Sequence, residues 1–185
     1  SVVASNSGGA ATYVLKANGV TVSGPTTTTF FTAGPLVTQN TFFTLEVTQG
    51  ASVIKKEFTY LFNPGTISAN LPSGVEDGIN YNSLDATRAT LVLNAPFKDF
   101  IYVAGSFNDW KPTSAYAMKK DASTGKFWLE LTGLTPGQVY TYQYLVCDVT
   151  NRPANSPAVV KTADPFSTLV LSPFDDGEIA TLGVY

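Results

Sequence analysis

The chain has 185 residues, of which 44% are hydrophobic and 14% are charged, a composition typical of a globular protein and not of a disordered one. Its formal net charge is −3 and no basic cluster exceeds a pair of lysines, which argues against nucleic acid as a partner because phosphate binding needs several cationic contacts. There is no His and a single Cys, Cys147, so the chain has no internal disulfide, no thiolate metal cluster and no imidazole to act as general base.

The first third of the chain is expected to form short antiparallel strands. Residues 11–22 are predicted to be a hairpin, because Asn18-Gly19 between alternating apolar residues strongly favours a two-residue turn. Further strands are expected at 26–32, at 41–49 and at 52–62, the last as a half-buried partner. Strands that recur about every 10 residues are typical of a small sandwich, and this segment resembles bacterial immunoglobulin-like modules. Only about five strands fit here, so we expect an incomplete sandwich that lacks its first strands.

The boundary between two domains is expected in a stretch rich in Pro and Gly. Residues 63–84 are predicted to be a linker and the lead-in to a second domain. The charge balance also shifts: residues 1–74 hold three Lys/Arg against two Asp/Glu (+1), and residues 75–185 hold eight against twelve (−4), which together give −3. We place the boundary near Ser73-Gly74, with an immunoglobulin-like module at 1–73 and a second β-sandwich at 74–185.

The second half is also expected to consist of strands and turns. Strands are predicted at 78–82, at 88–95 and from Phe100 onward, and a short strand at 115–119 should bring Met118 inward. No stretch shows a convincing helical period, so we expect the whole chain to be all-β, with two immunoglobulin-like β-sandwich domains in tandem.

Alternation along two later strands predicts which side chains leave the core. Successive side chains of a strand point to opposite faces. If Phe127 and Leu129 point inward, Trp128 points to the other face. Likewise Gln143 points away from the face shared by Tyr142 and its neighbour two residues on.

The stretch VAGSFNDWKP at 103–112 is the most informative part of the sequence. An apolar strand leads into a tight group in which Asn108 and Asp109 favour a turn, because their short side chains bond to nearby backbone. Trp110 follows this turn and precedes a proline, so we expect it to be only partly buried. A partly exposed indole is a flat apolar plate with an N–H on its rim, which suits the face of a sugar ring.

This stretch and several that follow it resemble a known family. The match is carried by GSFNDW at 105–110, Met118 with two lysines, GKFWLELTGLTPG at 125–137, YTYQYLV at 140–146 and TADP at 162–165. Together these motifs resemble carbohydrate-binding module family 48 of starch- and glycogen-acting proteins. The C-terminal part also resembles the accessory domain before the catalytic barrel of secreted α-amylases from Bacteroidetes-type bacteria.

The resemblance implies a glucan site on one sheet face. In the family the glycan is held by the Trp of the SFNxW motif, by a basic residue on the late Tyr-rich strand and by a second Trp. Trp110, with Asn108 beside it, matches the first position, and Gln143 stands in place of the basic residue. The second Trp has no counterpart, because an insertion at 147–161 contains no aromatic residue. Trp128 is the candidate to replace it.

We expect the chain itself to be non-catalytic. It is too short for a (β/α)8 barrel of about 250 residues, and the acidic pairs at 76–77 and 175–176 are expected to be solvated turn residues. No cofactor or metal is expected.

The resemblance implies an accessory region of a secreted α-amylase-type glycoside hydrolase that binds α-1,4-glucan weakly. Its partners would be starch, glycogen or maltooligosaccharide and the catalytic domain of the same protein. The alternative is a structural spacer that docks the barrel and binds no sugar. A surface adhesin of immunoglobulin-like repeats is a weaker third class.

The location expected from this resemblance is extracellular, cell-surface or periplasmic. The sequence contains no signal peptide, so we expect that it was removed or that the sequence is an excerpt. No apolar run approaches the roughly 20 residues that a membrane helix needs, so no membrane association is expected.

Overall fold

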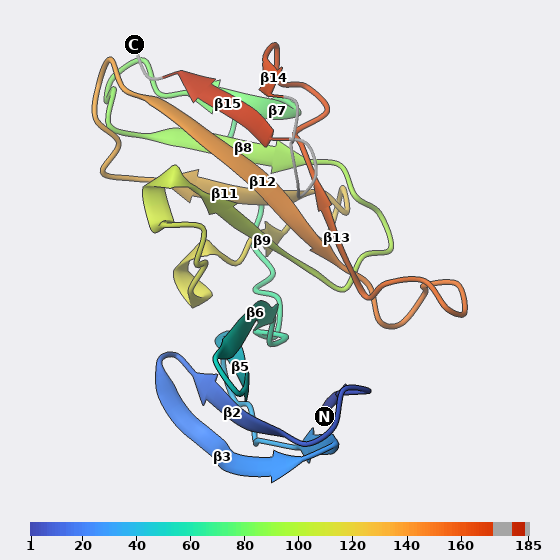
Figure 1. The fold of residues 1–185 in the computed structure, drawn as a ribbon. Coiled ribbons are helices and arrows are strands. Elements are labelled where there is room, and N and C mark those ends of the chain that lie inside the picture. The colour runs from blue at the N-terminus through green and yellow to red at the C-terminus, as the bar shows by residue number, and fades with distance from the viewer. Residues whose placement is uncertain (172–178, 184–185) are drawn as a thin grey trace. The chain divides into compact units, whose positions relative to one another are not determined.

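The computed structural model describes residues 1–171 and 179–183, with side-chain surroundings described up to residue 170. Nearly all of its regular structure is β-strand, and two short 3₁₀ turns are the only helical elements in these ranges. The all-β prediction is therefore confirmed. The chain divides into two compact units, Ser1–Phe62 and Asn63–Tyr185, which are described separately (Figure 1).

The first unit contains a four-stranded antiparallel sheet and a two-stranded ribbon. The sheet has the order β3-β2-β5-β6 and the ribbon pairs β1 with β4. The strands are β1 (Val2–Ser5), β2 (Ala11–Ala17), β3 (Val20–Thr28), β4 (Phe30–Ala33), β5 (Thr41–Gln49) and β6 (Ser52–Tyr60). Asn18 and Gly19 between β2 and β3 both have positive φ, 49° and 83°, as a type I′ turn requires, which confirms the predicted hairpin.

The core of the first unit lies between the ribbon and the middle of the sheet. Tyr13 and Leu15 of β2 and Phe43 of β5 are buried with Phe31 of β4, whose ring stacks on Tyr13 at a centroid distance of 5.2 Å. The ribbon covers β2 and β5 but leaves β6 exposed along its whole length. The prediction of a half-buried strand at 52–62 is therefore wrong, because the covering layer ends one strand too early.

The second unit packs two antiparallel sheets against each other. One has the order β10-β11-β8-β7; in the other, β12 pairs with β13 and β15 along one edge and with β9 along the other, and β14 extends β15. The strands are β7 (Gly78–Tyr81), β8 (Ala89–Leu93), β9 (Phe100–Gly105), β10 (Lys119–Lys120), β11 (Phe127–Leu131), β12 (Val139–Cys147), β13 (Val159–Thr162), β14 (Val170–Leu171) and β15 (Ile179–Gly183). The 3₁₀ turns are η1 (Ser106–Asn108) and η2 (Ser114–Tyr116).

The core of the second unit is built from alternate residues of four strands. β8 and β11 contribute their apolar rows from one sheet, and β9 and β12 contribute theirs from the other. The fully buried side chains include Leu91, Phe127, Ile101, Val103, Tyr142 and Tyr144. Met118 is buried as predicted, but the strand expected at 115–119 is replaced by η2 and the two-residue β10.

Residues 63–71, expected to be linker, pack on the second unit instead. Ala69 donates its backbone N–H to the carbonyl of Lys120 at 3.0 Å, and Lys120 donates to the carbonyl of Ile67 at 2.9 Å. Leu71 donates its N–H to Asp121 at 2.7 Å. The division between the two compact units therefore falls between residues 62 and 63 of the sequence, eleven residues before the boundary expected at 73/74. Pro and Gly mark irregular backbone here, but the segment is held by partners far along the chain.

Candidate functional site

Gly105 at the end of β9 and the two residues after it shape the loop that follows the strand. Gly105 leaves no room for a side chain, because a Cβ would lie 2.5 Å from the carbonyl of Thr141 and 2.7 Å from the ring of Phe107. Ser106 accepts a hydrogen bond from the N–H of Thr141 at 3.1 Å, which fastens the loop to β12. Phe107 packs beneath the loop against Tyr116 and Tyr140, at centroid distances of 5.7 and 6.3 Å.

Asn108 closes the same loop with both ends of its side chain. Its Oδ1 accepts from the N–H of Gly105 at 2.9 Å, and its Nδ2 donates to the carbonyl of Val103 at 3.0 Å. Both polar atoms of this amide are therefore engaged in holding the turn. Asn108 was predicted to be a site residue beside Trp110, and in the structure its side chain bonds to the backbone of the loop.

The next two residues turn the chain outward. Asp109 and Trp110 have positive φ, 52° and 59°, and Trp110 donates its N–H to the carbonyl of Gly105 at 3.0 Å. Positive φ is rare for a bulky residue, and such backbone strain costs about 1–3 kcal/mol. As a result Trp110 is 38% exposed, in agreement with the partial exposure predicted from the sequence. Asp109 is exposed next to it, and sequence reasoning did not select this carboxylate as a site residue.

A small cavity of about 110 Å³ lies under the loop. It is lined by Phe107, Tyr116 and Tyr140 together with residues 131–134. A cavity of this size holds a few water molecules and is too small for a sugar ring. Any glycan at this loop must therefore bind on the surface.

Trp128 points to the face opposite Phe127 and Leu129, as alternation predicted, but it is buried. Only 8% of it is exposed, its Nε1 donates to the carbonyl of Ala69 at 3.0 Å, and the ammonium of Lys119 lies 4.5 Å from its ring. The segment at 67–71 covers the outer face of β11 at this point. Trp128 is therefore a packing residue in this structure and not a second sugar platform.

Gln143 lies on β12 opposite Ala104 of β9 and points away from the Tyr142 side of the sheet. It is 4% exposed, so its amide does not reach solvent as an open glucan site would require. The structure therefore does not bring Trp110, Gln143 and Trp128 together on one exposed surface.

The insertion after β12 forms a fixed loop without aromatic rings. Asp99 accepts hydrogen bonds from the N–H groups of Val149 and Thr150 at 2.6 and 3.0 Å, and Asp148 forms an ion pair with Lys98 at 2.9 Å. A hollow of about 480 Å³ lies between this loop and β13, lined by Val, Pro and Ala side chains together with polar and charged ones, among them Arg152 and Asp148. It offers no ring on which a sugar could stack.

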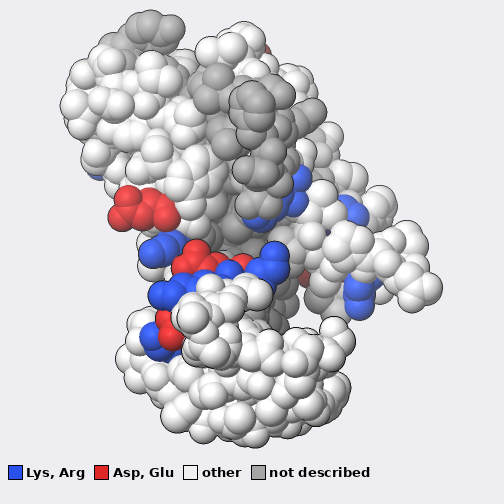
Figure 2. All heavy atoms as spheres, viewed as in Figure 1, with Lys and Arg blue, Asp and Glu red and all other residues white. Residues whose placement is uncertain are grey.

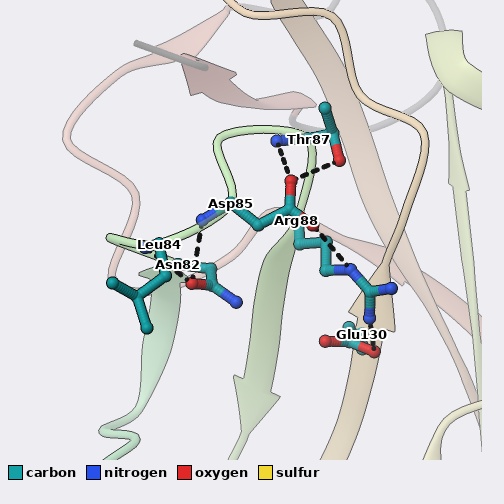
Figure 3. A network of polar contacts seen from close by, with 6 residues as sticks. All are labelled: Asn82, Leu84, Asp85, Thr87, Arg88 and Glu130. Atoms are coloured by element: carbon teal, nitrogen blue, oxygen red, sulfur yellow. Dashed lines mark hydrogen bonds and ion pairs between the residues drawn. The ribbon is translucent and has the colours of Figure 1, made fainter.

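Acidic residues of the second unit take part in fastening loops. Figure 3 shows Arg88 between Asp85 on its own turn and Glu130 on β11. The Arg88 Nε lies 3.0 Å from Asp85 and its Nη1 lies 3.2 Å from Glu130. Thr87 donates two hydrogen bonds to Asp85, and these, with Arg88, hold the pKa of that carboxyl below its usual value. The acidic pair at 175–176 lies outside the described residues.

Within the described ranges, no three His, Cys, Asp or Glu side chains gather closely enough to hold a metal ion. Across residues 1–171 and 179–183, no helix has the length and apolar character needed to cross a bilayer. In comparisons with known proteins, no family model matches the chain and no curated protein matches it. The resemblance to carbohydrate-binding module family 48 therefore stays a prediction from the motifs at 105–165.

Proposed function

We propose that the second unit binds an α-1,4-glucan on its surface through Trp110. The observation that carries this proposal is the structure of the loop. Gly105 leaves no room for a side chain and Asn108 bonds to the backbone on both sides, whereas Trp110 is exposed in a strained conformation. Unusual backbone conformations of this kind concentrate at functional sites. An indole presented in this way can lie against the apolar face of a glucose ring.

Asp109 supports the same site by its position next to the indole. A carboxylate accepts hydrogen bonds from sugar hydroxyl groups, and Asp109 is exposed. In this proposal Asp109 takes the place beside Trp110 that was predicted for Asn108, whose amide is engaged in the turn.

Binding through one ring is expected to be weak. Stacking on an aromatic side chain contributes about 1–3 kcal/mol by analogy with base stacking, and each hydroxyl hydrogen bond adds roughly 0.5–1.5 kcal/mol. Their combination gives a binding free energy of about −4 kcal/mol, which corresponds to a dissociation constant on the order of 1 mM. Weak binding suits an accessory module of a secreted α-amylase-type hydrolase, in which a linked catalytic domain raises the effective concentration.

The second candidate function is a structural spacer that docks the catalytic domain and binds no sugar. It is favoured by the burial of Gln143 and Trp128 and by the absence of any aromatic residue in the insertion at 147–161. In this account the exposed indole packs against the neighbouring domain of the full-length protein.

Calorimetric titration with maltoheptaose up to about 20 mM, well above the expected dissociation constant, separates the two functions. We expect saturable binding for the unaltered chain, none for Trp110→Ala, and weaker binding for Asp109→Ala. Cellohexaose, the β-1,4-linked analogue, is the control ligand and should bind more weakly. Trp128 fluorescence in Trp110→Ala reports whether the variant is folded. Absence of maltoheptaose binding to the unaltered chain would leave the spacer as the function.

A further inference from the structure

Strand β6 of the first unit has one paired edge and one open edge. It forms a hairpin with β5 across Gly50-Ala51, in a register that pairs Gln49 with Ser52 and Glu46 with Lys55. In the described part of the chain no strand pairs with its other edge. All nine of its residues are exposed, among them Val53 at 58%, Ile54 at 62% and Tyr60 at 52%. A long, apolar, open strand edge is a template for another strand.

The backbone groups at that edge come from alternate residues. In a hairpin closed by a two-residue turn, the residues that flank the turn exchange backbone hydrogen bonds, and the pattern alternates along the ladder. The even-numbered residues of β6 therefore direct their N–H and C=O groups to β5. Val53, Lys55, Glu57 and Thr59 direct theirs away from it, toward the open edge.

Charged side chains of the first unit gather around this strand. The unit has only five charged residues, Lys16, Glu46, Lys55, Lys56 and Glu57, and Figure 2 shows charged atoms of both signs interleaved in one part of the visible face of this unit, with uncharged atoms over the rest. Four of the five lie on the sheet face opposite the core. Glu46 bridges Lys16 at 2.9 Å and Lys55 at 3.1 Å, so the sign of charge alternates from β2 through β5 to β6.

This alternation ends at Lys55, whose side chain is 61% exposed at the open edge. A strand placed against that edge would continue the alternation if it offered a carboxylate opposite Lys55. Strand β6 carries one at the matching place. When a second copy pairs antiparallel about Lys56, each Lys55 lies opposite Glu57 of the other copy.

We propose that the β6 edge is a self-association surface, on which a second copy of this chain pairs antiparallel with its own β6 about Lys56. In this register the opposed residues Lys55 and Glu57 both present backbone groups to the open edge, so hydrogen bonds and ion pairs form together. On the core-facing side, Ile54 lies opposite Phe58 of the other copy, which continues the apolar row. Shifting the register by two residues either way places Lys55 opposite Lys55 or Glu57 opposite Glu57.

Lys56 opposes this association and explains why it is weak. The two-fold axis places the Lys56 residues of the two copies opposite each other, and like charges directly opposite are destabilising. An inward-facing lysine is also one of the devices that limit uncontrolled edge pairing. Pairing through a single strand edge brings few side chains together, so the dimer should form at protein concentrations of about 0.1 mM.

Charge reversal tests the register by sedimentation equilibrium from about 10 µM to 1 mM protein. Lys55→Glu and Glu57→Lys each turn two attractive pairs into repulsive ones, which should raise the dissociation constant about tenfold. The double variant restores both pairs and should return to within about threefold of the unaltered chain. Lys56→Gln should tighten association. Glu76→Lys, which changes the same charge on the second unit, is the matched control and should have no effect.

Disulfide cross-linking gives an independent test of the same geometry. Opposed residues of a non-hydrogen-bonded pair have Cα atoms about 4.5 Å apart, a separation that a disulfide spans. Lys56→Cys should therefore oxidise to a covalent dimer, while Ser52→Cys should not, because the two copies of residue 52 would lie about 26 Å apart. The native thiol does not compete, since burial raises the pKa of Cys147 to about 12. A monomer at 1 mM, a dimer indifferent to the charge reversals, or cross-linking by Ser52→Cys alone would overturn the proposal.

Discussion

The buried pair Tyr142 and Tyr144 offers a quantitative test of what holds the second unit together. Both hydroxyl groups donate to the same oxygen of Asp164, each at 2.8 Å, and the three residues are at most 1% exposed. Burial, as the larger cause, and the negative charge of Asp164, as the next, raise the pKa of Tyr142 well above its usual value. The other oxygen of Asp164 accepts from the N–H of Phe166 at 2.9 Å.

Removing one hydroxyl and removing both should have different consequences. Tyr142→Phe or Tyr144→Phe removes one hydrogen bond to a charged group, which should lower the free energy of unfolding by about 2 kcal/mol. The double variant leaves the buried Oδ2 of Asp164 with neither hydroxyl donor. Because an uncompensated buried charge costs about 3–5 kcal/mol, the double loss should reach about 5 kcal/mol, more than the roughly 4 kcal/mol sum of the single losses.

Urea unfolding followed by tryptophan fluorescence measures this loss in the correct unit. Both tryptophans, Trp110 and Trp128, belong to the second unit, so the first unit does not contribute to the signal. A double-mutant cycle then gives the coupling between the hydroxyl groups, which we expect to be about 1 kcal/mol. Additive losses, or single losses below about 0.5 kcal/mol, would refute the reasoning that Asp164 depends on both donors.

Three further predictions concern the pH dependence of stability, the packing at Gly105 and the absence of catalysis. Asp121 accepts several hydrogen bonds, of which the one from the N–H of Leu71 has the largest effect, and these hold its pKa well below its usual value. The stability that the ionised carboxylate adds is present above the unfolded pKa of about 3.9 and is lost as the pH falls toward the folded pKa. The urea midpoint of unfolding should therefore decrease as the pH is lowered from 5 to about 2, and it should decrease less in Asp121→Asn. The same pH dependence in both proteins would contradict this. Gly105→Ala should destabilise the unit by about 2 kcal/mol or more, because its Cβ would lie 2.5 Å from the Thr141 carbonyl; calorimetry showing unchanged melting would be inconsistent. No reducing sugar should be released from starch or glycogen, and turnover abolished by changing one carboxylate would disprove this.

The parts of the fold that depend on neighbouring residues could be predicted from the sequence. The Asn18-Gly19 turn was predictable because a type I′ turn is set by the two residues that form it, and both have positive φ. The inward rows of β8 and β11 were predictable for a similar reason, since alternation is a local property of a strand.

The parts that depend on distant residues could not be predicted. Alternation gave the correct face for Trp128, but its burial follows from Ala69 and its neighbours, which lie about sixty positions earlier in the sequence. β6 is exposed because the β1-β4 ribbon covers only β2 and β5, and the apolar pattern of β6 does not reveal this. The buried state of Gln143 is also a property of its surroundings and not of its strand.

The candidate site also has one feature that the sequence predicts and one that it does not. Trp110 was predicted to be partly exposed because it follows a turn, and it is 38% exposed. Whether Asn108 or Asp109 closes the turn depends on which side chain folds back onto β9, and an Asn-Asp pair does not specify this. Hydrogen bonds from Asn108 to both Gly105 and Val103 decide it.

The indole N–H signals of the chain test the central claim most directly. The chain has two tryptophans, so a ¹H–¹⁵N correlation spectrum should show two indole resonances, which Trp110→Phe assigns. On addition of maltoheptaose up to about 20 mM, the Trp110 indole should shift along a saturable curve. The Trp128 indole should stay in place, because its N–H is bonded to Ala69 beneath the covering segment. A Trp110 resonance that does not move, or a shift confined to Trp128, would contradict glucan binding at this loop.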